Sequence, residues 1–316
     1  MRLLADGRVR SGAAVAAALG LAPAQVSRAV RELEAHGLGI SRVRGRGYRL
    51  EKPFDALDAD AIKRALGDRP AIALTLLDEC DSTSSWLAER AAAGAPSGAA
   101  VACELQRAGR GRRGATWHSG LGTSLTFSLL WRFDRGASAL GGLSLAVGVA
   151  CIRALAKLGH AEVALKWPND LVVGDAKLGG ILIELAGEGS GPTAAVIGIG
   201  INIRATQEAR RAVGRKIAGL AAGGGPSVSR SVLLGALLAA LADALPAFAR
   251  EGFAGFRAEW LRHHVDQGRP VRVLVPPERT VDGLATDVAE DGALVVETPH
   301  GLERFHSAEV SLRRAA

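Results

Sequence analysis

The apolar positions near the N-terminus recur at the spacing of two short helices. Residues 11–20 and 25–36 predict helices joined by a tight turn, with Pro23 in the first turn of the second helix and Gly37 after its end. Three apolar residues of the second helix fall on one side and are expected to be buried: Val26, Val30 and Leu33. Only residues 1–5 precede the first turn, so a preceding helix is a single turn long. We expect either a natural start further upstream or a trimmed module.

A glycine-rich turn that carries arginines follows this helix pair. Residues 39–50 form two short alternating runs around the turn, which predicts a β-hairpin. Two helices and a hairpin are typical of a winged helix-turn-helix, whose second helix enters the major groove of DNA while the wing touches phosphates. The residues expected to contact DNA are Ser27, Arg28, Arg31, Arg44 and Arg46. The alternative is a protein-interaction module whose arginines are merely solvated.

The rest of the chain alternates runs of strands with packed helices. Strands are expected at 71–78, 99–105, 124–131, 163–167, 171–173, 178–185 and 194–203, and helices at 55–67, 82–94, 143–158 and 229–251. This mixture indicates the α+β class with a largely antiparallel sheet, not an alternating doubly wound fold. Beyond residue 268, short strands at 271–275, 281–288, 293–298 and 303–312 predict a small β-barrel-like domain. The expected domains are 1–52, 53–268 and 269–316.

Composition narrows the class of protein. The 316 residues are 48% hydrophobic and 22% charged, which excludes intrinsic disorder, and 4% aromatics argue against a base-stacking nucleic-acid binder. Three distant cysteines without metal-ligand spacing fit a reduced, cytoplasmic protein with buried thiols. We expect neither a signal peptide nor a membrane span.

The positive charge is concentrated at the N-terminus. The net charge of the chain is +7, and residues 1–52 carry ten Lys or Arg against four Asp or Glu. A basic module is therefore joined to a nearly neutral body.

The strongest chemical motif is the loop from Gly109 to Gly114, between two predicted strands. Its alternating glycines allow the backbone to approach a ligand, and three guanidiniums offer paired donors to phosphate or carboxylate oxygens: Arg110, Arg112 and Arg113. The loop is not a Walker motif, because Gly-Lys-[Ser/Thr] is absent. The alternatives are a solvated basic loop and a nucleic-acid contact.

Two lysines form the second motif. Lys166 and Lys177 stand at opposite ends of a predicted hairpin that turns at residues 174–175. An ammonium group beside the glycines that follow Lys177 has room for a ligand and would neutralise a carboxylate and a phosphate. The alternative is that both lysines are exposed strand residues. Asn169 and Asp170 fit ligand or Mg²⁺ contacts and equally fit turn residues.

The third motif is a polar helix start at residues 81–84. Its backbone N–H groups and hydroxyls can bind a neutral urea carbonyl or an anion, although an N-cap needs no ligand. The sequence shows no Ser-His-Asp order, no histidine-rich metal cluster and no acid pair of glycosidase type. We therefore expect the protein to supply neither a nucleophile nor a metal cage.

These motifs, in this order, resemble those of the bifunctional biotin protein ligase and biotin-operon repressor family, the BirA type. The matching segments are 81–83, 106–114, 166–170, 177–182, 198–202 and 309–313. The resemblance implies a winged helix-turn-helix, a central sheet of the class II synthetase-like biotin/lipoate ligase fold and a C-terminal SH3-like β-barrel. It covers nearly the whole chain.

The activity that the resemblance implies has two steps and forms AMP. Biotin and MgATP give biotinyl-5′-adenylate and pyrophosphate, and the biotinyl group then passes to a lysine of the biotin carboxyl carrier protein of acetyl-CoA carboxylase. The resemblance also implies an adenylate-bound homodimer that binds the biotin operator and represses transcription.

The resemblance also assigns roles to residues. The biotin-binding set is Ser82, Thr83, Ser84, Gln106, Arg110, Gly111, Arg112 and Lys177. The ATP- or adenylate-binding set is Arg110, Arg112, Trp117, Lys166 and Asn202. The catalytic set is Lys177, Arg110 and Arg112, and Asp170 is the candidate Mg²⁺ contact.

Two residues depart from the family pattern. Ser84 stands where the family usually has Asn, and Ala115 stands where it usually has Arg, so one amide donor and one cation are lost. Two other functions are weighed against the ligase. A biotin-responsive regulator without ligase activity would require damaged catalytic residues, which are intact here. A lipoate-type acyl ligase fits less well with the basic N-terminal module and the arginine loop.

Overall fold

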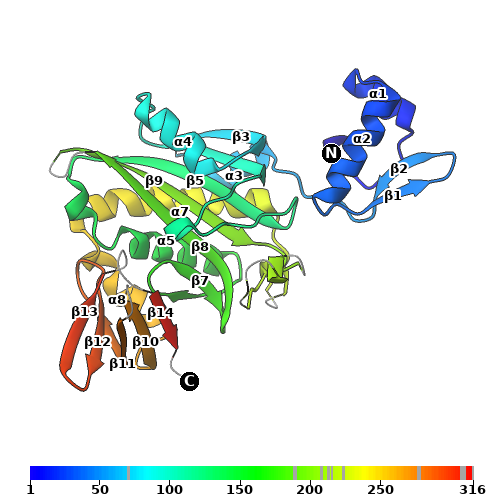
Figure 1. The fold of residues 1–316 in the computed structure, drawn as a ribbon. Helices are drawn as coiled ribbons and strands as arrows, with labels where there is room; N and C mark the ends of the chain where they lie inside the picture. Colours follow the sequence, from blue (N-terminus) through cyan, green and yellow to red (C-terminus); the bar gives the residue numbers. More distant parts are fainter. Residues whose placement is uncertain are drawn as a thin grey trace.

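A seven-stranded sheet lies at the centre of the molecule (Figure 1). The strands are β3 (Ala73–Cys80), β4 (Ala99–Gln106), β5 (Ser124–Phe133), β6 (Ala164–Lys166), β7 (Asp170–Val173), β8 (Ala176–Gly187) and β9 (Thr193–Asn202). Their order is β3-β4-β5-β9-β8-β7-β6. Strands β3 and β4 run parallel, and the other neighbouring pairs are antiparallel. The mixed, mostly antiparallel sheet confirms the predicted α+β class.

The structure is a computed structural model of the chain. It describes residues 1–69, 72–187, 191–206, 209–211, 214, 216–222, 225–275, 279–306 and 311–314. Parts of three sequence predictions lie outside the described residues: residue 71 of the strand expected at 71–78, residues 307–310 of the strand expected at 303–312, and residues 309 and 310 of the last motif.

The two faces of the sheet pack against different helices. Because side chains alternate along a strand, neighbouring residues enter different cores. Val196 packs on one face with Leu87 of helix α4 (Thr83–Ala92), whereas Ile197 joins the larger core on the other face. That larger core includes α5 (Leu143–Lys157) and α7 (Arg230–Glu251). Serine side chains cap the starts of two of these helices, Ser82 for α4 and Ser229 for α7.

Two helical stretches are as long and apolar as membrane spans. They are Ala137–Lys157, which ends with α5, and α7. In the most apolar part of each stretch, 67% of Ala137–Lys157 and 50% of α7 are buried inside the molecule. The two helices pack against each other, and α5 also packs against the sheet and against α8 (Ala254–His263). This burial accounts for their apolar composition.

The N-terminal module sits at one end of the body and contains two helices and a hairpin (Figure 1). Its elements are η1 (Arg2–Leu4), α1 (Gly12–Leu19), α2 (Pro23–Ala35), β1 (Ile40–Val43) and β2 (Gly47–Leu50). Helix α1 ends at Gly20, whose positive φ of 64° suits a residue without a Cβ. Val26 and Val30 are buried as predicted, and Leu33 packs against them while partly exposed. The element before α1 is one short turn, as the sequence indicates.

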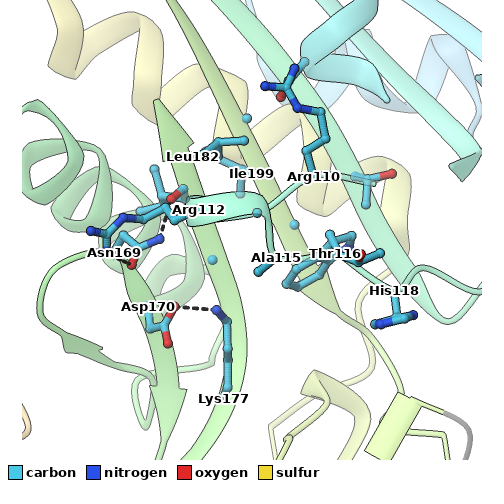
Figure 2. A pocket seen from close by; sticks show the side chains of 18 of the residues that line it. Arg110, Arg112, Ala115, Thr116, His118, Asn169, Asp170, Lys177, Leu182 and Ile199 are labelled. Carbon is cyan, nitrogen blue, oxygen red and sulfur yellow. Dashed lines mark hydrogen bonds and ion pairs between the residues drawn. The ribbon is translucent and has the colours of Figure 1, made fainter. Parts of the chain in front are cut away.

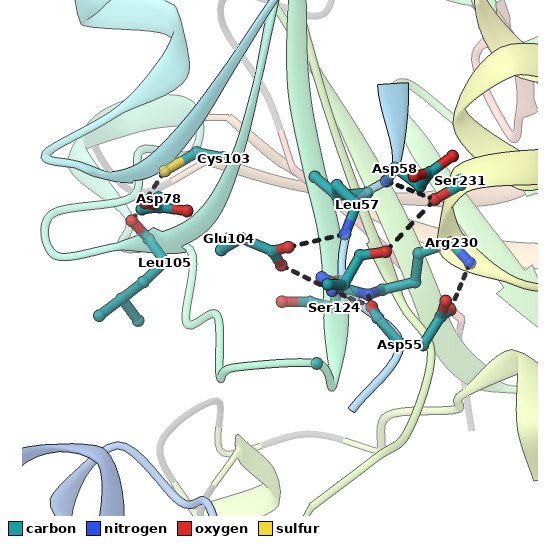
Figure 3. Close-up of polar contacts among 12 residues, drawn as sticks. Asp55, Leu57, Asp58, Asp78, Cys103, Glu104, Leu105, Ser124, Arg230 and Ser231 are labelled. Carbon is teal, nitrogen blue, oxygen red and sulfur yellow. Dashed lines mark hydrogen bonds and ion pairs between the residues drawn. The ribbon is translucent and has the colours of Figure 1, made fainter. Parts of the chain in front are cut away.

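A buried ion pair fixes the segment that joins the module to the body (Figure 3). Arg230 and Glu104 lie 2.6 Å apart, with exposures of 1% and 2%. The other Glu104 oxygen accepts the Leu57 N–H at 2.7 Å, and Arg230 donates to the carbonyl oxygen of Asp55. Because the joining segment is held extended by these contacts, helix α3 begins at Ala59, capped by Asp58, and not at residue 55 as predicted.

The C-terminal part is an antiparallel sheet of five strands. They are β10 (Pro270–Val275), β11 (Arg279–Val288), β12 (Leu294–Thr298), β13 (Gly301–Phe305) and β14 (Ser311–Arg314), in the order β13-β12-β11-β10-β14. The single strand expected at 303–312 is therefore two strands on opposite edges of the sheet. Helix α8 is absent from the sequence predictions because its apolar and polar residues are only weakly separated onto different faces.

The three cysteines differ in burial. Cys103 and Cys151 are buried, and burial raises the pKa of the Cys151 thiol to about 12. Cys80 is only half-buried, which corrects the expectation that all three are buried. Its pKa is lowered by a side-chain hydrogen bond with Cys103.

Removing the carboxylate of the buried ion pair is expected to destabilise the fold. Glu104→Ala leaves the Arg230 charge unpaired in the interior, and this should lower the free energy of unfolding by about 3–5 kcal/mol. Urea unfolding followed by circular dichroism measures the loss. The matched control is Asp282→Ala, which breaks an exposed ion pair with Arg272 and should leave the free energy of unfolding nearly unchanged. Equal, small losses in both variants would contradict the structural role of the pair.

Candidate active site

Glycines on one face of the central sheet leave a hollow above two neighbouring strands. On β9, Gly198 and Gly200 alternate with Ile199 and Ile201, which belong to the large core of the other face. On β8, Gly180 lies opposite Gly200. Since these glycines have no side chains, a cavity of about 310 Å³ opens there. Its size suits a small organic ligand.

Every ligand-binding residue that the sequence predicts lines this cavity, and Figure 2 shows part of the lining. The residues are Ser82, Thr83, Ser84, Gln106, Arg110, Gly111, Arg112, Trp117, Lys166, Asp170, Lys177 and Asn202. They come from the start of α4, the ends of β4 and β6, the loop after β4, and strands β7, β8 and β9. The fold therefore gathers segments that are distant in the sequence.

The arginine loop is a tight hairpin at the edge of this cavity. The backbone N–H of Trp117 donates to the Gly109 carbonyl at 2.8 Å, and the backbone N–H of Gly111 donates to the Ala115 carbonyl at 2.7 Å. A Cβ on Gly109 would collide with the Trp117 carbonyl oxygen, so this glycine lets the two arms of the loop meet. Arg113 adopts a left-handed conformation with φ of 55°. Such backbone strain is concentrated at functional sites.

The two predicted catalytic arginines point in different directions (Figure 2). Arg110 donates to Glu184 on β8, and its other terminal nitrogen donates to the Ser85 hydroxyl at 3.0 Å. Arg112 donates to the Asn169 side-chain oxygen at 3.2 Å. Arg110 therefore fastens the loop to helix α4 and strand β8, whereas Arg112 reaches Asn169 in the lining of the cavity.

Asn169 holds Arg112 from a fixed position. Its side-chain nitrogen donates to the Ile181 carbonyl at 2.7 Å, and its own carbonyl accepts the Ile181 N–H at 2.9 Å. Burial, followed by the charge of Arg113, lowers the pKa of the Arg112 guanidinium. An arginine starts from a pKa so high that it stays cationic at neutral pH. Asn169, which fitted either a ligand contact or a turn residue, therefore holds the Arg112 guanidinium in place.

Lys177 and Asp170 form an ion pair inside the cavity. The Lys177 Nζ lies 2.5 Å from the Asp170 Oδ1, and the side chains are 14% and 13% exposed.

Lys166 lies on edge strand β6, with its Nζ 3.9 Å from the buried Asp266 carboxylate. The prediction that the two lysines stand at the ends of one hairpin is wrong, because strand β7 runs between β6, which carries Lys166, and β8, which carries Lys177. Three strands, β6, β7 and β8, replace the single hairpin, because the chain also turns at residues 167–169.

The opposite end of the cavity is neutral and polar. Ser82, Thr83 and Ser84 start helix α4 and are all at most 5% exposed. The Gln106 side-chain oxygen accepts hydrogen bonds from the Thr83 N–H at 2.8 Å and from the Thr83 hydroxyl at 3.0 Å. This end can recognise an uncharged group that both donates and accepts hydrogen bonds.

A tryptophan covers the glycine floor. A Cβ on Gly200 would lie 2.5 Å from the nearest Trp117 ring carbon, so the indole rests directly on the strand backbone. The Trp117 indole N–H has no hydrogen-bond partner among the described residues. Nearby, Asn202 borders both the main cavity and a second one of about 210 Å³ that also contains His118 and Arg204. This region offers a flat aromatic face and an amide side by side.

The predicted DNA contacts lie outside this site. Arg28, Arg31, Arg44 and Arg46 are exposed, on α2 and on the turn between β1 and β2. Arg28 pairs with Glu32 at 3.0 Å, and Ser27 is half-buried beside the Tyr48 hydroxyl. The described residues contain no group of three or more His, Cys, Asp or Glu side chains that could hold a metal ion.

One contributor to the site escapes the sequence reasoning. Glu184 holds Arg110, although no sequence motif singled it out. The signal is the period of β8: Gly180, Leu182 and Glu184 share one face of the strand. The alternation along β8 identifies Glu184 only once it is known which face of the strand borders the cavity.

Comparisons with known proteins agree with this geometry. Residues 78–202 match the biotin/lipoate A/B protein ligase family, and residues 267–313 match the biotin protein ligase C terminal domain. The bifunctional ligase/repressor BirA of Escherichia coli is 34% identical over 313 residues, with 99% of this chain and 96% of that protein covered. The biotin–[acetyl-CoA-carboxylase] ligase of Paracoccus denitrificans is 31% identical, with 74% of this chain and 98% of that protein covered.

A solved structure is similar over most of the chain. The biotin protein ligase from Aquifex aeolicus in complex with biotin and ATP has a TM-score of 0.65 and 28% identity, covering 77% of this chain and 99% of that one. The match with the Escherichia coli protein is nearly end to end and above 30% identity, and the family models match in the same order. This chain belongs to the biotin protein ligase family.

Proposed function

We propose that this protein joins biotin to the biotin carboxyl carrier protein of acetyl-CoA carboxylase in two steps. Biotin and ATP first form biotinyl-5′-adenylate with release of pyrophosphate, and a lysine of the carrier protein then displaces AMP. The observation that carries the proposal is one cavity with a neutral polar end and a cationic end, Arg112 with Lys177. Membership of the biotin protein ligase family supports it.

The cavity can divide the ligand by charge. Ser82, Thr83, Ser84 and Gln106 would bind the ureido ring, which is uncharged. Arg112 and Lys177 would bind the carboxylate and the α-phosphate, where negative charge builds during attack. Both attacking groups, the biotin carboxylate and the acceptor amine, come from substrates. The protein therefore contributes position and charge neutralisation.

The nucleotide end of the site would combine stacking with hydrogen bonds. Trp117 would stack on the adenine, and the Asn202 amide would bind its edge. Lys166 would bind phosphates. Gly111 would present its backbone to the ligand. The Arg110 side chain would favour the closed loop through Glu184, and a closed loop would keep water away from the reactive anhydride.

Magnesium would enter as MgATP. Asp170 is the one carboxylate among the described residues that line the cavity. Mg²⁺ is commonly held by one or two carboxylates together with substrate phosphates, so this donor set fits an ion that arrives on the nucleotide. The ion would neutralise phosphate charge. Asp170 would orient Lys177 through their ion pair.

A second proposed function is repression of transcription. Residues 1–52 would be a winged helix-turn-helix, with α2 in the major groove and the β1–β2 turn on phosphates. The exposed arginines on these two elements favour this function, as does the ligase/repressor named in Escherichia coli. Residues 53–268 would be the catalytic domain and 269–316 an SH3-like domain. Operator binding would require a homodimer of the adenylate-bound, cytoplasmic protein.

Two other functions fit the site less well. A lipoate-type ligase needs an apolar end for a dithiolane ring, whereas this cavity ends in serine, threonine and glutamine side chains. A regulator without ligase activity has no need of the paired Lys177 and Asp170. ATP–pyrophosphate exchange that depends on biotin and not on lipoate would separate these functions from the ligase.

Loss of the cavity lysine should abolish the first step. Lys177→Ala removes a cation that faces developing charge, and we expect biotin-dependent ATP–pyrophosphate exchange to fall by about 10²–10³-fold. Lys157→Ala, an exposed lysine on α5, is the control and should keep full activity. Circular dichroism checks folding of both variants. Normal biotinylation of the carrier protein by Lys177→Ala would overturn the assignment.

The loop cation should govern retention of the adenylate. Arg112→Ala is expected to raise the dissociation rate of biotinyl-5′-adenylate at least about tenfold, the effect of one lost charge-assisted hydrogen bond. Stopped-flow displacement of the adenylate by excess biotin measures this rate. Arg107→Ala, which removes an exposed partner of Glu79 at the base of the loop, should leave the rate unchanged. Equal rates in the two variants would exclude Arg112 from the ligand site.

The arginines of the N-terminal module should set the salt dependence of DNA binding. The slope of log K against log salt on a mixed-sequence duplex should be about −0.9 per phosphate contact. The double variant Arg44→Ala/Arg46→Ala should reduce the slope by about two units, whereas Arg262→Ala on the body should not change it. Biotin and ATP should tighten binding by the wild type. Unchanged binding on their addition contradicts the repressor function.

A further inference from the structure

A buried serine behind the cavity connects the hydroxyl groups at its neutral end. Ser128 lies on β5, is 0% exposed and is not part of the cavity lining. Its hydroxyl donates to the Thr83 hydroxyl at 2.9 Å and lies 3.1 Å from the Ser84 hydroxyl. The Thr83 hydroxyl lies 3.0 Å from the Gln106 side-chain oxygen. Three hydroxyls and an amide thus form one continuous chain.

A single backbone N–H determines the direction of every hydrogen in this chain. The Thr83 N–H can only donate, so the Gln106 atom at 2.8 Å must be the amide oxygen. That oxygen can only accept, so the Thr83 hydroxyl must donate to it. The Thr83 hydrogen is then used, and Ser128 must donate to Thr83. For the same reason Ser84 must donate to Ser128.

This ordering decides what the cavity offers to a ligand. The Gln106 amide nitrogen is the donor left over, because both hydrogen bonds of this side chain to described residues use its oxygen. The hydroxyl oxygens of Thr83 and Ser84 keep lone pairs but have no hydrogen left to give. A cyclic urea presents one carbonyl acceptor between two N–H donors. It therefore matches a site that has one amide donor and two hydroxyl acceptors.

We propose that Ser128 is a positioning residue for biotin: its hydroxyl donates to the Thr83 hydroxyl and accepts from the Ser84 hydroxyl, and so holds both hydroxyls in place to receive the ureido ring. The inference rests on the function proposed above and adds a residue that touches no ligand. It assigns Ser128 a role in recognition of the ring and none in the chemistry at the other end of the cavity.

The strand pairing explains why the chain of hydroxyls fits. Ser128 lies opposite Gly198 in the β5–β9 ladder. A Cβ on Gly198 would collide with the Ser84 hydroxyl and would lie 3.5 Å from the Ser128 hydroxyl. The same glycine that helps to form the hollow therefore leaves room for the contact between the two serines.

Ser128→Ala tests the proposal by separating binding from chemistry. The variant leaves Ser84 without an acceptor and Thr83 without a donor, and its dissociation constant for biotin, measured by calorimetry, should rise about tenfold. The rate of ATP–pyrophosphate exchange at saturating biotin and ATP should stay within about threefold of wild type. Ser128→Thr, which keeps the hydroxyl, should restore most of the affinity.

Two further variants separate the chain of hydroxyls from a general loss of packing. If the hydroxyls act together, Ser84→Ala should weaken biotin binding markedly in the wild type and much less in the Ser128→Ala background. Ser231→Ala is the control: it removes a hydroxyl that is also buried and bonded, to the Asp58 N–H, but lies outside the cavity. It should leave biotin affinity unchanged.

The possible results have distinct meanings. If the wild type shows no biotin-dependent exchange, the proposed function fails. If the wild type is active and Ser128→Ala binds biotin as tightly, or if the effects of Ser84→Ala and Ser128→Ala simply add, the role of Ser128 is overturned. A fall in the maximal rate with unchanged affinity also contradicts it.

Discussion

The alternation of side chains along the central strand β9 is the constraint on which the rest of the structure depends. On β9, every second residue enters a large apolar core, and the residues between them face helix α4 and the cavity. Ile197, Ile199 and Ile201 stabilise the fold, whereas Gly198 and Gly200 form the floor of the site. Because the period of a strand is two, a slip of one residue would exchange the isoleucines with the glycines. Folding and ligand binding are thus specified by the same ten residues.

The charged side chains of this molecule also differ in role according to their burial. The Arg230–Glu104 pair is fully buried and joins the segment before α3 to β4 and α7. The Lys177–Asp170 pair is partly open to the cavity, where a charged ligand can compete for the lysine. The exposed arginines of the N-terminal module are left for long-range attraction. Residues 1–52 carry six of the seven net positive charges of the chain, ten Lys or Arg against four Asp or Glu.

Much of the fold could be predicted from the sequence, and the reasons for the exceptions are physical. Strands β4, β5 and β9 have long apolar runs, so their existence and type were clear. Helix α8 lacks a strong apolar period, and the start of α3 depends on a tertiary contact with Arg230 that no local pattern contains. The predicted site residues were found together because each lies within a motif. Glu184 and Ser128 could not be found this way, because their roles depend on strands that are adjacent only in three dimensions.

The exposed clasp between Arg110 and Glu184 has a consequence for the rate at which ligands enter. The two side chains are 45% and 28% exposed, so water and salt weaken their attraction. Pairs of this kind contribute about 0–1 kcal/mol, which corresponds to at most a roughly fivefold bias toward the fastened loop. This pair by itself therefore holds the loop only weakly. The entry of biotin would be limited by diffusion and desolvation, and the long residence of a bound adenylate would have to come from the ligand's own contacts.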